Sequence, residues 1–159
     1  MRCFVTGATG YVGSRIVRAL ESGGITTYRL LRNRQATKSE PQAFLCASTG
    51  DFSSAELTRF FFANRIDCVV HCSNVFDSSP RQRVAEEMLY ANFLVPAKVL
   101  NSAINANAKT FINLASGWQL DAARLVSSPD YVATKESFRL FLKSKGTQIE
   151  TYSIFANEI

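Results

Sequence analysis

The chain has 159 residues, of which 47% are hydrophobic and 19% are charged, and its formal net charge is +5 at pH 7. This size and composition are typical of one globular domain with a real core. No apolar stretch approaches the length of a membrane span and the N-terminus has no signal-peptide pattern, so we expect a cytoplasmic protein that does not enter membranes. The basic residues are scattered, which favours an anionic small ligand over nucleic acid.

The N-terminus combines a strand pattern with a glycine-rich turn. Residues 2–6 form a short, mostly apolar run that predicts a buried strand, and residues 14–20 form an amphipathic helix pattern. Between them lies G-A-T-G-Y-V-G, with glycines at positions 7, 10 and 13. A strand, a glycine-rich turn and a helix together are the context of a dinucleotide-phosphate site.

Each glycine has an expected role in that turn. Gly7 would let the chain turn tightly, Gly10 would let the backbone approach a pyrophosphate at the positive helix end, and Gly13 would let the helix pack closely on the strand. The alternative is a tight strand-to-helix connection without a ligand. The position of the pattern, between an apolar strand and a helix, favours the phosphate site.

A second strand is predicted at residues 26–31, and basic residues follow it. A Rossmann unit often has an acid here that binds the adenosine ribose, but this chain has Arg32 and Arg34 instead. Two arginines suit the 2′-phosphate of NADP. The alternative is that both are solvated loop residues.

The next elements are a short strand at residues 43–47 and a helix that begins after Ser53 or Ser54 and ends at Asn64. Asp51 and Phe52, between them, are where an adenine ring could be held. The alternative is that they are an acid at a helix start and a core aromatic.

A fourth strand is predicted at residues 67–72, where Ser73 and Asn74 follow its C-terminal end. Ligands bind at this edge of open α/β sheets. The sequence C-V-V-H-C within this strand could indicate a metal site. However, on a strand His71 points away from the cysteines on either side, so we expect no metal and free, buried thiols.

A long helical pattern covers residues 80–106, and Pro96 is expected to kink it. Its buried stripe comprises Val84, Met88, Ala91, Val95 and Val99. Asn92 lies beside that stripe, where its amide needs a partner, either a neighbouring backbone or a cofactor.

The last third predicts a fifth strand at residues 109–115, a helix at 131–145 and a sixth strand at 149–155. Ser116 follows the fifth strand, and Tyr131 and Lys135 share one face of the helix. The alternation of strands and helices predicts an α/β fold with a doubly wound parallel sheet, built as one domain over residues 1–159.

The order of these motifs resembles the extended short-chain dehydrogenases/reductases, the NAD-dependent epimerase/dehydratase group. The resembling segments are residues 6–13, 50–52, 67–72, Asn92, 111–116 and 131–135. The resemblance implies a three-layer Rossmann fold and catalysis by Ser116, Tyr131 and Lys135.

The chemistry of these three residue types agrees with that implication. Reduction of a carbonyl needs a hydride and a proton. A phenol moves protons poorly near neutral pH, and an ammonium one helical turn away favours its ionised form. A serine hydroxyl can stabilise charge that forms on the substrate oxygen. The alternative for Tyr131 and Lys135 is an ordinary pair on a helix surface.

Arg32 and Arg34 favour NADP as the cofactor, with NAD possible. Its expected contacts are Gly7, Thr9, Gly10, Tyr11, Val12, Gly13, Arg32, Arg34, Asp51, Phe52, Cys72, Ser73, Asn74, Asn92, Leu114, Lys135 and Phe155.

The chain departs from the family pattern in three ways. The interval from Ser116 to Tyr131 is short, as in deoxysugar 4-ketoreductases. Gly117 and Trp118 stand where dehydratases have an acidic pair, which argues against a dehydratase. Family members continue well beyond Ile159, so we expect the C-terminal substrate region to be missing or truncated.

We therefore expect an NAD(P)H-dependent oxidoreductase that acts on a small molecule, a nucleotide-linked sugar, with tyrosine as the proton donor. One alternative is a related epimerase or an enzyme like the dihydroflavonol reductases. Another is a non-catalytic NAD(P)-binding protein or an incomplete subunit. A homodimer or a partner chain would fit the family, through the helices at residues 80–106 and 131–145.

Overall fold

A computed structural model describes residues 1–32, 42–46, 51–76 and 82–156. Six parallel strands form one sheet in the order β3-β2-β1-β4-β5-β6. The strands are β1 (Arg2–Thr6), β2 (Thr26–Arg32), β3 (Ala43–Cys46), β4 (Cys68–His71), β5 (Thr110–Ser116) and β6 (Glu150–Ala156). The predicted doubly wound α/β fold is confirmed.

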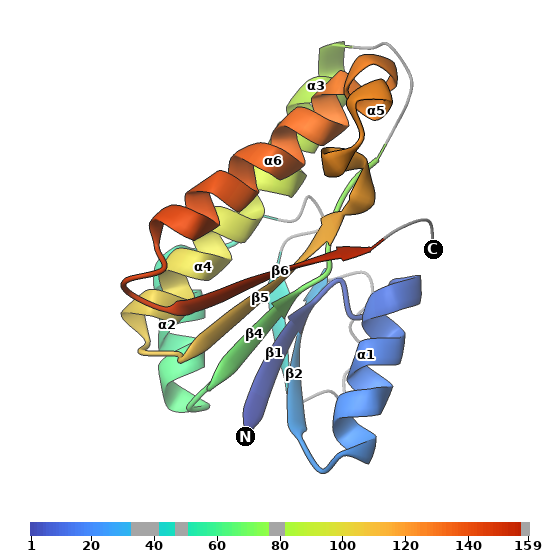
Figure 1. Ribbon diagram of the computed structural model, residues 1–159. Coiled ribbons are helices and arrows are strands. Elements are labelled where there is room, and N and C mark those ends of the chain that lie inside the picture. Colours follow the sequence, from blue (N-terminus) through green and yellow to red (C-terminus); the bar gives the residue numbers. More distant parts are fainter. Residues whose placement is uncertain (33–41, 47–50, 77–81, 157–159) are drawn as a thin grey trace.

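Helices cover both faces of this sheet and make three layers (Figure 1). One face carries α1 (Tyr11–Ser22), and the other carries α2 (Ser54–Ala63), α4 (Val95–Asn105) and α6 (Pro129–Ser144). The remaining helices are α3 (Gln82–Leu89), the π-helical turn η1 (Tyr90–Leu94), the 3₁₀ helix η2 (Gly117–Leu120) and α5 (Ala122–Ser127). None of the helices in the described ranges is long and apolar enough to cross a membrane.

The larger core lies between the sheet and α2, α4 and α6. Phe4, Phe61 and Phe111, from two strands and α2, have no exposed surface. Phe4 and Phe61 meet edge to face with ring centroids 4.6 Å apart. Fully burying one such ring contributes about 1.5–3 kcal/mol, so this face holds the strands in place.

The face under α1 is packed by smaller side chains. Cys68 and Val70 of β4 point to this face, and their neighbours Val69 and His71 point to the other. The prediction that His71 faces away from the cysteines is therefore confirmed. All four cysteines are free; three are buried, but Cys72 is only half-buried, unlike the expected buried thiol.

The predicted helix over residues 80–106 is interrupted. Its middle is the π-helical turn η1, and Pro96 lies in the first turn of α4. Proline has no N–H to donate to the carbonyl four residues earlier, and a π turn is a local way to accommodate the break. The turn also changes the buried face, because Asn92 is 2% exposed while Ala91 is only half-buried.

The expected loop before Pro129 contains two short helices, η2 and α5. In addition, α6 begins at Pro129 rather than at Tyr131. Proline is favoured in the first helical turn because the N–H that it lacks has no helical acceptor there. Likewise α1 begins at Tyr11, three residues earlier than the pattern indicated.

Candidate active site

The turn between β1 and α1 is as tight as its glycines predict. Gly7 has φ of +67°, and a Cβ there would lie 2.7 Å from the backbone nitrogen of Ser73. A Cβ on Gly13 would lie 2.1 Å from the carbonyl oxygen of Gly7. Both positions therefore require glycine, one for its left-handed backbone and the other for close packing.

The first turn of α1 offers a site for an anion. Gly10 caps the helix without a side-chain hydrogen bond, and the first turn contains no acidic residue. The N–H groups at a helix start have no helical acceptors, and the helix dipole places partial positive charge there. The role of Gly10 toward a pyrophosphate remains a prediction.

Two cavities meet at this turn, and Gly7 and Asn74 line both of them. The larger has a volume of about 500 Å³ and runs along the C-terminal ends of β4 and β5 to α6. The smaller has a volume of about 200 Å³ and lies toward β2 and β3. The pair has the layout that a two-part ligand joined by a pyrophosphate needs.

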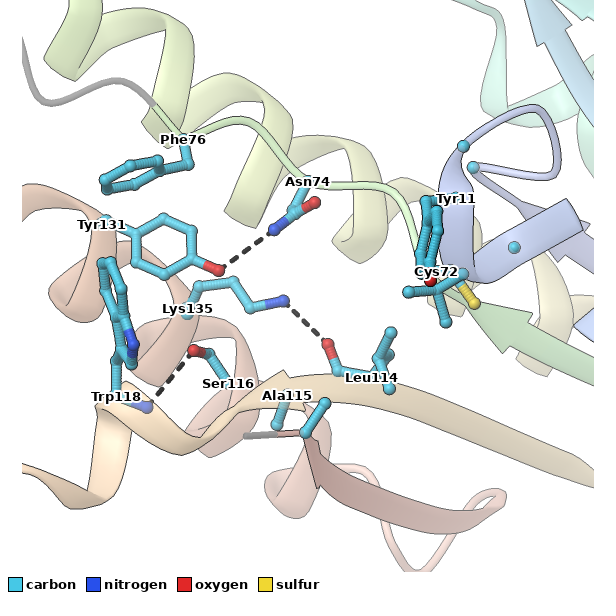
Figure 2. Close-up of a pocket in the computed structure, with 15 residues that line it drawn as sticks. Tyr11, Cys72, Asn74, Phe76, Leu114, Ala115, Ser116, Trp118, Tyr131 and Lys135 are labelled. Carbon is cyan, nitrogen blue, oxygen red and sulfur yellow. Dashed lines mark hydrogen bonds between the residues drawn. The ribbon is translucent and has the colours of Figure 1, made fainter. Parts of the chain in front are cut away.

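Ser116, Tyr131 and Lys135 all line the larger cavity (Figure 2). Ser116 ends β5, whereas Tyr131 and Lys135 lie one turn apart on α6. The fold thus brings the three residues to one wall. Their catalytic roles remain a prediction.

Tyr131 is held by one hydrogen bond and two aromatic contacts. The Nδ2 amide of Asn74 donates to its hydroxyl oxygen at 3.0 Å. Its ring lies edge to face with Phe76 and Trp118, at centroid distances of 5.1 and 5.8 Å. Only 7% of the residue is exposed. The phenol therefore has a defined position before any substrate arrives.

Lys135 is a buried cation that faces the same cavity. It is 6% exposed, and its ammonium group donates to the backbone oxygen of Leu114 at 2.8 Å. Burial disfavours the charged form and lowers the pKa of Lys135 to about 8. One of its three N–H groups is occupied by Leu114, which leaves others for a ligand or for Tyr131.

The Ser116 hydroxyl is oriented by the chain that follows it. Its oxygen accepts a hydrogen bond from the backbone N–H of Trp118 at 3.3 Å (Figure 2). A hydroxyl that accepts in this way keeps its own hydrogen for another acceptor. Ser116 can therefore donate into the cavity.

The smaller cavity contains several of the expected cofactor residues. Thr9, Arg32 and Ser73 line it. Arg32 ends β2, is exposed and makes no ion pair with any residue in the described ranges. The Thr6 hydroxyl fixes the chain after β4 through the Ser73 hydroxyl at 3.1 Å and the His71 ring at 2.7 Å. Arg34 lies outside the described residues.

Four predicted cofactor contacts line neither cavity. Asp51 binds the Lys98 ammonium at 2.7 Å, and Phe52 packs in the core as the structural alternative indicated. Asn92 accepts from the N–H of Val75 at 2.8 Å and donates to its carbonyl at 2.9 Å, so its partner is backbone. Phe155 of β6 is the fourth predicted contact that lines neither cavity.

The other predicted contacts line one cavity or both. They are Gly7, Thr9, Gly10, Tyr11, Val12, Gly13, Arg32, Cys72, Ser73, Asn74, Leu114 and Lys135. Three aromatic residues that were not predicted also line the cavities: Phe76 and Trp118 the larger one and Tyr90 the smaller one. Only their nearness to Asn74, Ser116 and Asn92 in the sequence could have indicated them. Ala156 was missed as well, although it is the register partner of Ser116 on the neighbouring strand.

The residues present fit a dinucleotide. The glycine turn has no room for a Cβ, the helix start behind it has no side-chain cap, and the adjoining cavities extend in opposite directions from it. Backbone N–H groups would hold the pyrophosphate, Arg32 would face the adenosine part, and Lys135 would face the nicotinamide part.

Solved structures with the same fold include UDP-glucose 4-epimerases from Thermotoga maritima, with UDP-glucose, and from Thermus thermophilus, with NAD. Both have a TM-score of 0.74; their identities are 20% and 19%, with 98% and 96% of this chain and 54% of each of theirs covered. An oxidoreductase of the short-chain dehydrogenase/reductase family from Burkholderia thailandensis has a TM-score of 0.78 at 18% identity. The match covers 99% of this chain and 68% of that protein.

This chain spans about half the length of both epimerases. No curated protein matches the sequence. The model of the NAD dependent epimerase/dehydratase family matches residues 3–132, which is most of the chain. The glycine turn, the helix start and most of the strands that form the two cavities lie within that match. The chain belongs to the NAD dependent epimerase/dehydratase family.

Proposed function

We propose that this chain carries the cofactor-binding and catalytic part of an NADP(H)-dependent oxidoreductase that reduces a keto group on a nucleotide-linked sugar. One observation carries the proposal: Ser116, Tyr131 and Lys135 line a cavity that meets, at the glycine turn, the smaller cavity lined by Arg32. The family match and the UDP-glucose bound to one structural neighbour support the substrate class.

In this proposal each side chain has one task at the substrate carbonyl. A bound nicotinamide dinucleotide would supply the hydride. The Tyr131 hydroxyl, which accepts from Asn74, keeps its own proton and gives it to the carbonyl oxygen as charge develops there. The Ser116 hydroxyl donates to the same oxygen and stabilises that charge.

Lys135 holds positive charge near this reaction. Its ammonium is anchored on Leu114, and its remaining N–H groups can hold the nicotinamide ribose and favour the ionised form of Tyr131 once the proton has left. A pKa of about 8 means that most of the lysine is still charged at pH 7. We therefore expect activity to fall as the pH rises through 8.

Arg32 supports NADP over NAD. It lines the smaller cavity at the end of β2, where an acid would favour NAD. A guanidinium can bind a 2′-phosphate with two parallel hydrogen bonds. The Thermus epimerase was solved with NAD rather than NADP. The preference of this chain between the two cofactors should therefore be measured.

A sugar epimerase is the second candidate, favoured by the two UDP-glucose 4-epimerases among the structural neighbours. It would use the same three side chains but consume no cofactor overall. A reductase oxidises one NADPH for each product, so absorbance at the nicotinamide band separates the two reactions.

The decisive variant is Tyr131→Phe, assayed for NADPH oxidation with nucleotide-linked keto sugars. Removal of the proton donor should lower kcat by about 10²–10⁴, while NADPH affinity stays near that of the wild type. Ser116→Ala should lower kcat by a smaller factor. If the wild type binds NADPH but turns over neither keto sugars nor UDP-glucose, the chain is a cofactor-binding protein or an incomplete subunit.

A further inference from the structure

A chain of side-chain hydrogen bonds joins the end of β5 to α6, outside both cavities. The backbone N–H of Ser116 donates to the Oε1 of Gln119 at 2.9 Å. The Nε2 of the same glutamine donates to the Oε2 of Glu136 at 2.9 Å. Gln119 therefore uses both ends of its amide, one toward the strand and the other toward the helix.

Glu136 is itself fixed by an arginine one helical turn later. The Nε of Arg139 donates to both carboxylate oxygens, at 3.0 and 2.8 Å. This hydrogen bond, followed by that from Gln119, lowers the pKa of Glu136. The carboxylate is therefore ionised at neutral pH, and an ionised acceptor makes a stronger hydrogen bond than a neutral one.

The location of this link connects it to the catalytic residues. Gln119 lies in η2, the short helix that begins directly after Ser116 and also orients the serine hydroxyl through Trp118. Glu136 directly follows Lys135 on α6. Leu120 at the end of η2 is 72% exposed and Val126 of α5 is 83% exposed, so neither side chain is packed into the core. The side-chain link is thus a direct tie between the strand end and the helix.

We propose that Gln119 and Glu136 are positioning residues, which set the place of the Ser116 hydroxyl relative to Tyr131 and Lys135. The inference rests on the catalytic roles proposed above for those three residues. Reaction rates fall steeply when reacting groups are misplaced by even 1 Å, so a tie at this point has a functional consequence beyond stability.

The test uses four variants of the full chain. Gln119→Met keeps the side-chain length and removes both hydrogen bonds. Gln119→Glu places a second carboxylate beside Glu136 and removes the donor. The double variant Gln119→Glu/Glu136→Gln restores a donor-acceptor pair in the reverse direction. Gln148→Met is the matched control, because Gln148 is exposed in the turn before β6.

The first readout needs no turnover: amide hydrogen exchange at Ser116 and the ring resonances of Tyr131 by NMR. We expect Gln119→Met to speed exchange of the Ser116 amide by about fivefold or more and to shift the Tyr131 signals, while Gln148→Met changes neither. The double variant should lie closer to the wild type than Gln119→Glu alone. Unchanged Tyr131 signals in Gln119→Met would overturn the proposal, even if the melting temperature falls.

The second readout is steady-state kinetics. Gln119→Met should lower kcat by about tenfold to a hundredfold with the KM for NADPH unchanged, and the double variant should recover part of the loss. Equal kcat values in wild type and Gln119→Met would contradict the proposal. A wild type without any turnover would contradict the proposed function instead, and the NMR comparison would still decide whether the link positions the site.

Discussion

The two cavities differ in how deeply the candidate functional side chains that line them are buried. In the larger one the functional side chains are buried and bonded to protein: Tyr131 is 7% exposed and Lys135 is 6% exposed. In the smaller one Arg32 is exposed at the sheet end. The residues proposed for catalysis are therefore part of the packed interior, so changing them should alter stability as well as any chemistry. The group expected to select the cofactor can be changed almost freely.

The glycine turn borders both cavities, so a substitution that distorts the turn should impair both of them at once. A Cβ on Gly13 would lie 2.1 Å from the Gly7 carbonyl oxygen, which forces α1 away from the turn. We expect Gly13→Ala to lower the free energy of unfolding by about 3 kcal/mol or more and to abolish NADPH binding. Chemical denaturation and calorimetry measure the two effects.

Gly23→Ala is the matched control for that variant. Its Cβ would lie 3.4 Å from the nearest atom, and Gly23 ends α1 with an ordinary negative φ. We expect a change within about 0.5 kcal/mol and unaltered binding. If Gly13→Ala behaved like this control, the close packing of the turn would not be what shapes the two cavities.

Burial beneath the site predicts a pH dependence on the acid side. His71 is fully buried, and burial lowers its pKa to about 3 from the ordinary histidine value of about 6.5. His71 therefore takes up a proton near pH 6.5 in the unfolded chain but stays neutral at that pH in the folded chain. The stability contribution is complete above pH 6.5 and is lost as the pH falls toward 3, at about 1.4 kcal/mol per pH unit.

Urea unfolding of wild type and His71→Gln between pH 7.5 and 5 checks this slope. That window lies above the carboxylates whose pKa values are lowered, such as Glu21 and Glu136. The wild type should lose stability faster than the variant as the pH falls. Parallel curves would show that His71 carries a proton in the folded protein.

Lys135 predicts a pH dependence of the same sign on the basic side, where stability again rises with pH. Its pKa is lowered from 10.5 to about 8 by burial, so between pH 8 and 10.5 the unfolded chain holds a proton that the folded chain has released. Wild-type stability should therefore rise by roughly 3 kcal/mol relative to Lys135→Met across that window. Unfolding at pH 7.5 and pH 10.5 measures the difference. Lys143→Met, at an exposed position of the same helix, is the control for loss of a lysine side chain.

The parts of the fold that could be predicted from the sequence are those that depend on residues close together in the chain. Strand positions and the glycine turn follow from apolar runs and spacing, and α6 follows from periodicity. The π-helical turn before Pro96 could not be predicted, because several ways of accommodating a proline have similar local signals. The two short helices after Ser116 begin at local caps, Ser116 for η2 and Asp121 for α5, but both are too short to show a helical period in the sequence.

The site divides in the same way. Tyr131 and Lys135 could be paired from their spacing on a helix. The hydrogen bond from Asn74 to Tyr131 joins residues 57 positions apart, and its existence depends on how β4 and α6 pack. For Phe52 the sequence predicted an adenine contact, with core packing as the alternative, and the structure places it in the core beside Phe44.

The central claim is that the two cavities form one dinucleotide site. A substitution at Arg32, which we expect to disturb the fold least, tests this claim most directly. Calorimetric titration of wild type and Arg32→Ala with NADPH and NADH would measure it. We expect the wild type to bind NADPH more tightly than NADH. We also expect Arg32→Ala to lose about 1.5–3 kcal/mol of NADPH affinity, with NADH affinity and stability unchanged. If neither nucleotide bound to the folded wild type at millimolar concentration, the claim would be contradicted.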